Sequence, residues 1–227
     1  MTISAVGTLA GNGSTSAASL TFTLAPGAAT SNVICLFLKW NQTGSLTASV
    51  ATASSGILWT PVSAGRVGLT GTGTSIYMQG FIGIAQSVTS RVTTMTWSGT
   101  ATSPLYAYQQ FHTDIASPHW SEVSSGTIQS ATAVTSMPGP ALNCGAVGGL
   151  YSALWFTGGT GATTGTPGFI FQVDSAANVY GYGLNVGGTE QPSATQTSGT
   201  YDSYGMSLND GSVFDPWVPS TTGMGFM

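Results

Sequence analysis

The chain has 227 residues, of which 41% are apolar and 10% aromatic, and its formal net charge is −4. This composition can bury a core and excludes the weakly hydrophobic, highly charged class of disordered chains. Only 4% of the residues are charged, against about 25% in typical soluble domains. Three basic residues cannot supply the positive surface that phosphate binding requires, so we expect no direct contact with nucleic acid.

The N-terminal stretch MTISAVGTLAG lacks the basic region and the apolar run of a secretory signal. The longest apolar run, VICLFL at 33–38, is too short to span a bilayer. We therefore expect a soluble protein, made in a cytoplasm, with no signal peptide and no membrane insertion.

Alternation of apolar and polar residues predicts β-strands, because no stretch carries apolar residues at the helical period. LTFTL at 20–24 places Leu and Phe on one face and Thr on the other. VICLFLKW at 33–40 is apolar on both faces, as in a central strand covered on each side. Further strands are predicted at 46–52, 59–67, 75–85, 91–97, 105–112, 149–156, 168–173, 179–186 and 201–208.

Segments rich in Gly, Ser and Asn separate these runs and supply turns. The pattern predicts an all-β fold: an antiparallel, jelly-roll-like β-sandwich of about a dozen short strands over a single domain, residues 1–210. A closed barrel is the second choice. A β-solenoid is the third, because no fixed repeat length is found.

The C-terminal segment 211–227 differs from the rest, with two prolines and no alternation. Its large apolar side chains would either fold back over the sandwich or dock on a neighbouring subunit. The candidate interface residues are Phe214, Trp217, Phe226 and Met227.

Both histidines of the chain lie in YAYQQFHTDIASPHWSEVSSG, 106–126. Alternation predicts a half-buried strand that ends near His112, followed by a loop over 114–122. A metal site could be drawn from His112, Asp114, His119 and Glu122, but their spacing matches no strong motif, so a solvated loop is favoured.

Signatures of hydrolases, phosphate-binding loops and dinucleotide-binding folds are absent. Lys39 is interpreted as a surface or edge charge, and the seven acids offer no clear catalytic pair. Cys35 and Cys144 are interpreted as buried free thiols. We expect no enzymatic activity, no cofactor and no bound metal.

Sugar binding through exposed aromatic side chains is the main alternative. Most of the tryptophans lie on or beside predicted strands, which leaves Trp120 and, in the tail, Trp217 as candidate ligand contacts. Tyr106 and Tyr108 are further candidates that could form a contact surface with Trp120.

Several features follow one another along the chain: SNVICLFLKW, then LWTPVSAG at 58–65, the aromatic strand YAYQQFHTDI, and LYSALWFTGGTG in a Gly-rich half. In this the chain resembles small bacteriophage virion proteins built from jelly-roll or immunoglobulin-like modules. Members of that group usually carry Glu or Asp after the aromatic strand, where this chain reads QQFH. The resemblance implies a structural component of the virion: a capsid decoration, minor capsid or minor tail protein.

The nearly uncharged composition agrees with a surface covered by other subunits. The expected partners are further copies of the chain, as a homo-oligomer, and other capsid or tail proteins. The alternative function is a carbohydrate-binding adhesin that contacts a host glycan.

Overall fold

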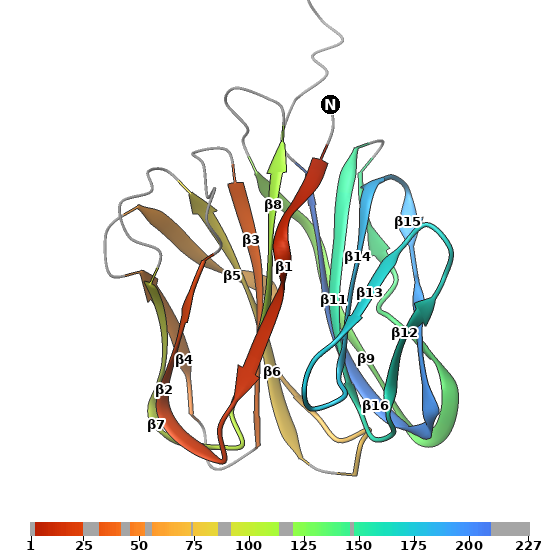
Figure 1. The fold of residues 1–227 in the computed structure, drawn as a ribbon, viewed down its shortest axis with the longest axis horizontal. Helices are drawn as coiled ribbons and strands as arrows, with labels where there is room; N and C mark the ends of the chain where they lie inside the picture. Colours follow the sequence, from red (N-terminus) through yellow and green to blue (C-terminus); the bar gives the residue numbers. More distant parts are fainter. Residues whose placement is uncertain are drawn as a thin grey trace, which may run out of the picture.

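The computed structural model describes residues 3–24, 32–41, 46–52, 56–73, 75–85, 92–113, 120–145 and 148–209. These residues form antiparallel sheets stacked in three layers (Figure 1). The prediction of an all-β antiparallel sandwich is confirmed, and the described ranges contain sixteen strands where about a dozen were expected for the whole chain. The described residues contain no helix long and apolar enough to cross a membrane.

The middle layer, here the central sheet, has five strands in the order β1-β8-β3-β6-β5. They are β1 (Ile3–Gly13), β3 (Asn32–Asn41), β5 (Ile57–Leu69), β6 (Ile76–Ala85) and β8 (Leu105–Thr113). Strand β3 lies in the middle of this sheet and is buried on both faces, as its continuous apolar sequence predicts.

The second layer, here the small sheet, has the order β2-β7-β4 and covers one face of the central sheet (Figure 1). Its strands are β2 (Ser16–Thr23), β4 (Ala48–Thr52) and β7 (Val92–Thr102). Strand β1 pairs with β8, β2 pairs with β7, and β3 pairs with β6. This nested pairing over two sheets is the connectivity of a jelly roll.

The third layer, here the C-terminal sheet, has the order β12-β16-β11-β14-β13, with β9 also paired to β16. Its strands are β9 (Ser121–Pro138), β11 (Gly149–Thr157), β12 (Gly161–Gly165), β13 (Ile170–Val173), β14 (Val179–Val186) and β16 (Ser193–Asn209). A separate two-stranded ribbon joins β10 (Leu142–Asn143) to β15 (Thr189–Glu190).

Side-chain alternation along β3 divides the interior into two cores. Val33, Cys35 and Phe37 enter the middle core, between the central and C-terminal sheets. Leu36 and Trp40 enter the jelly-roll core, between the central and small sheets. A third cluster, here the outer core, lies on the far face of the C-terminal sheet and is formed by buried residues of β11 and its neighbours. Because the middle core takes side chains from both halves of the chain, the jelly roll and the C-terminal sheet pack as one body.

Two sequence interpretations of the stretch around the histidines were wrong. Strand β8 is buried on both faces, where a half-buried strand was expected, because the C-terminal sheet covers the face that a two-layered sandwich would leave open. Glu122, placed in a loop by the sequence, lies in β9, an 18-residue strand rich in Ser and Thr that runs along β16. The tail 211–227 lies outside the described residues.

The two cysteines are free thiols without solvent access, which confirms the sequence interpretation. Burial raises the pKa of Cys35 and of Cys144 to about 12. Since only the thiolate is a good nucleophile, neither thiol should react with a disulfide reagent at pH 8 in the native protein, and both should react after unfolding in guanidinium. Rapid native labelling of either cysteine would contradict this packing.

Candidate functional site

The tyrosines expected to contact a ligand lie inside the jelly roll. Tyr106 and Tyr108 are only 7% and 5% exposed, on the face of β8 that meets the small sheet. The Tyr108 ring stacks on Phe22 at 4.1 Å between centroids, and its hydroxyl donates a hydrogen bond to the Thr23 carbonyl oxygen at 2.8 Å. Burial raises the pKa of Tyr108 to about 12. These contacts hold the two sheets of the jelly roll together.

The third expected ligand contact, Trp120, is 5% exposed and belongs to the middle core. Tyr106 and Tyr108 lie in the jelly-roll core, so the three side chains occupy two different cores on opposite faces of the central sheet. The structure therefore places them as packing residues and does not gather them into one exposed aromatic surface. Trp217 lies outside the described residues.

The residues considered for a metal site have other partners in the structure. The His112 Nδ1 atom lies 2.9 Å from the Asn32 amide oxygen. The Glu122 carboxylate accepts hydrogen bonds from the backbone N–H and the hydroxyl of Ser63 on β5. Asp114 and His119 lie outside the described residues. Within the described ranges, no group of three or more His, Cys, Asp or Glu side chains could hold a metal ion.

Asp202 is a fully buried carboxylate that joins the C-terminal sheet to the jelly roll. Its oxygens accept hydrogen bonds from the backbone N–H of Gly71 at 2.7 Å and of Thr72 at 3.0 Å, and from the Thr72 hydroxyl at 2.9 Å. These donors belong to the turn between β5 and β6. A Cβ atom on Gly71 would lie 2.6 Å from Asp202 Oδ1, so only glycine lets the turn approach this closely.

The lysine interpreted as a surface or edge charge is buried instead, and that interpretation was wrong. Lys39 is 4% exposed, near the end of β3, on the face that meets the C-terminal sheet. Its ammonium lies 4.2 Å from the centroid of the Phe156 ring on β11 and donates a hydrogen bond to the Asn41 amide oxygen at 3.1 Å. Both contacts are electrically neutral, so neither compensates the positive charge.

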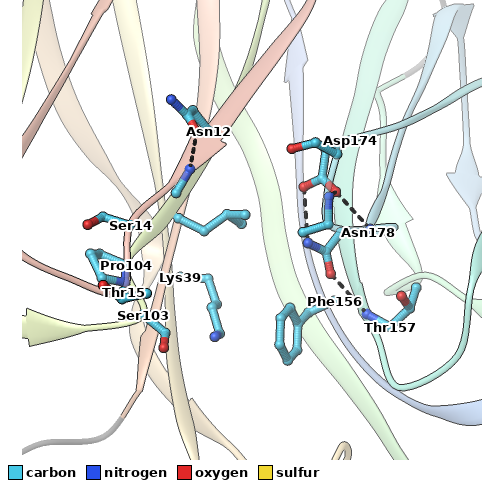
Figure 2. Close-up of a pocket in the computed structure, with 14 residues that line it drawn as sticks. Asn12, Ser14, Thr15, Lys39, Ser103, Pro104, Phe156, Thr157, Asp174 and Asn178 are labelled. Atoms are coloured by element: carbon cyan, nitrogen blue, oxygen red, sulfur yellow. Dashed lines mark hydrogen bonds between the residues drawn. The ribbon is translucent and has the colours of Figure 1, made fainter.

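Lys39 lines a cleft of about 450 Å³ between the jelly roll and the C-terminal sheet. One wall is formed by the turns β1–β2 and β7–β8, and the other by the turn β13–β14 and the end of β11. Figure 2 shows Lys39 and Phe156 between these two walls. The site thus combines a buried cation with walls that carry both polar groups and apolar surface, the latter from residues such as Leu105 and Phe156.

Burial lowers the pKa of Lys39 from 10.5 to about 8, and the nearby charge of Asp202 opposes part of this shift. The unfolded chain therefore holds the proton more tightly than the folded chain. The free energy of unfolding therefore rises between about pH 8 and pH 10.5, because in this range the folded protein has lost this proton and the unfolded chain still holds it.

Substitution of this lysine tests the electrostatic description. Lys39→Met keeps the volume and removes the charge, so we expect it to raise the free energy of unfolding at pH 7 by about 1–2 kcal/mol. The variant should also lose the rise in stability between pH 8 and 10.5. Guanidinium unfolding of both proteins across this range measures the effect. An unchanged slope in Lys39→Met would contradict it.

Comparison with known proteins adds no identification: no protein-family model matches the chain, and no curated protein or solved structure matches it.

Proposed function

We propose that this protein is a structural component of a bacteriophage virion. In this proposal it is a capsid decoration, minor capsid or minor tail protein that assembles as a homo-oligomer on the particle. The observation that carries the proposal is the scarcity of charge on the described surface, because two of the six charged side chains of the described residues, Lys39 and Asp202, are buried in the interior. The outer surface is therefore even poorer in free charge than the composition indicates.

Of the other four charged side chains, Arg66 is exposed, and Glu122, Asp174 and Glu190 are partly buried. Arg66 lies over the Tyr77 ring at 4.6 Å and donates a hydrogen bond to the Leu46 carbonyl oxygen. The Asp174 carboxylate accepts hydrogen bonds from the backbone N–H groups of Ala176 and Asn178 within its own turn. A free monomer usually needs a mixed charged surface to resist association, so this surface favours burial against other subunits.

The outer face of the small sheet shows this scarcity of charge most clearly. Its exposed positions carry small hydroxyl or methyl side chains, among them Ser19, Thr21, Thr23, Thr96 and Ser49. A flat, uncharged sheet face of this kind can pack on a neighbouring subunit without burying an unpaired charge. The jelly-roll connectivity also agrees with a virion role, because viral capsid domains use it, although fold alone does not fix function.

Charge placed on this face tests the proposal. We expect the native chain to sediment as a defined oligomer, and Thr21→Glu combined with Ser49→Glu to shift it to monomers. Both sites are exposed, so the melting temperature should change little. The control adds the same charges at exposed Thr163 and Thr189 in the C-terminal half. A native chain that is monomeric at every concentration would contradict the assembly proposal.

Glycan recognition is the second candidate function. Its expected contacts Tyr106, Tyr108 and Trp120 are buried, so they do not favour it. The cleft beside Lys39 is the observation that favours glycan recognition.

A further inference from the structure

We propose that the cleft between the jelly roll and the C-terminal sheet binds a small saccharide that carries a carboxylate, and that this carboxylate pairs with the Lys39 ammonium. The inference concerns a ligand-binding activity and stands apart from the proposed virion role. It rests on the cleft, on the buried cation between its walls and on the chemistry of those walls.

The jelly-roll wall of the cleft is held in place by the protein's own hydrogen bonds. The backbone N–H of Ser14 donates to the Pro104 carbonyl oxygen at 2.9 Å, and the N–H of Ser103 donates to the Thr15 carbonyl oxygen at 2.9 Å. These bonds tie the turn β1–β2 to the turn β7–β8. The polar side chains of this wall, which include Asn12, are therefore presented on a preformed surface (Figure 2).

The opposite wall is fixed in the same way. The Asn178 amide oxygen accepts a hydrogen bond from the backbone N–H of Thr157 at 3.3 Å, and its NH₂ group donates to Asp174 at 3.0 Å. The Thr157 hydroxyl donates to the Ala177 carbonyl oxygen at 2.9 Å. A cleft with both walls fixed loses little conformational entropy when a ligand enters.

Lys39 supplies the charge that selects the ligand. Its two neutral contacts leave the ammonium without a paired anion, in a site where burial strengthens electrostatic attraction. Two carboxylates also act on this site: Asp202, whose charge opposes part of the fall in the Lys39 pKa, accepts hydrogen bonds from the β5–β6 turn. Asp174 lines the opposite wall of the cleft and accepts hydrogen bonds within its own turn. A ligand carboxylate would provide the missing partner.

The rest of the cleft indicates a polyol. Its jelly-roll wall carries hydroxyl and amide groups from Asn12, Ser14, Thr15 and Ser103, which suit the hydroxyl groups of a sugar ring. A volume of about 450 Å³ lies in the range of small-molecule sites. The single lysine matches the single negative charge of a carboxylate better than the double charge of a phosphate monoester.

Calorimetric titration with glucuronate and glucose tests the inference, because the two sugars differ in one group, a carboxylate against a hydroxymethyl. We expect glucuronate to bind at pH 7 at least tenfold more tightly than glucose, and Lys39→Met to remove this preference. The matched control is Arg66→Met, which removes a cation that stacks on Tyr77, away from the cleft lining. This variant should bind glucuronate as the native protein does.

A second readout needs no variant. The carboxylate of glucuronate stays ionised above pH 7, whereas Lys39 loses its proton as the pH rises, so binding should weaken at least tenfold between pH 7 and pH 10.5. Equal affinity for the two sugars, full binding by Lys39→Met, or binding that does not change with pH would overturn the inference. Because these titrations contain no particles, their failure would leave the virion proposal standing.

Discussion

Replacement of Asp202 by alanine is expected to lower the free energy of unfolding by about 3 kcal/mol. The substitution leaves the buried N–H group of Gly71 and the partly buried N–H group of Thr72 without their acceptor, and it also removes the acceptor of the Thr72 hydroxyl. Each buried donor without a partner costs about 1–3 kcal/mol, and relief from burying the carboxylate offsets part of the total. Urea unfolding followed by circular dichroism measures the change.

Glu122→Gln is the matched control, because Glu122 also accepts hydrogen bonds from β5 across the same junction but lies in a more exposed setting. We expect this variant to lose less than about 1 kcal/mol. Equal losses in the two variants would mean that burial of the Asp202 contacts adds nothing, and would contradict the role given to Asp202 in joining the two halves.

Phe37→Ala is expected to destabilise the protein by about 4 kcal/mol. Phe37 is fully buried at the centre of the middle core, and its ring lies 5.8 Å from the Tyr180 ring and 6.2 Å from the Tyr204 ring, centroid to centroid. The truncation removes contacts with both halves of the chain at once. Because the middle core joins the central sheet to the C-terminal sheet, thermal unfolding of the variant should remain a single transition at a lower temperature.

The control for this truncation is Leu58→Ala on β5, where the leucine side chain is 53% exposed. We expect a change within about 0.5 kcal/mol. Two separate unfolding transitions in Phe37→Ala, one for the jelly roll and one for the C-terminal sheet, would show that the layers do not depend on the middle core.

Much of the architecture could be predicted from local sequence patterns. The continuous apolar run of β3 predicted a central strand covered on both sides, and LTFTL predicted a strand with one buried face. Both follow from the two-residue period of a strand, which is a local property. The pairing of strands far apart in the chain, such as β1 with β8, has no local signal and could not be predicted.

Three features could not be predicted because they depend on the third layer. Strand β8 alternates in sequence as a half-buried strand does, and only the presence of the C-terminal sheet explains why both its faces are buried. Most residues of β9 are partly buried or exposed, so a sequence rich in Ser and Thr suits this strand. The same composition is typical of loops, and the strand was therefore not predicted. The turns that line the cleft come from three separate parts of the chain, around residues 12–15, 103–105 and 174–178.

Lys39 carried a signal that was available in the sequence. It lies two residues after Phe37 on the same face of an otherwise apolar strand, so strict alternation would have placed it in the interior. Its position near the strand end favoured the surface interpretation instead. The face of the strand on which a lysine lies therefore predicts its burial better than its distance from the end of the strand does.

Sedimentation of the purified chain with and without phage particles or empty capsids of its source is the decisive experiment for the proposed virion role. We expect a defined oligomer that co-sediments with the particles, and the ratio of bound protein to particles should reach a fixed limit as more protein is added. A monomer that stays in the supernatant at every ratio would contradict the proposal that other virion subunits cover this charge-poor surface.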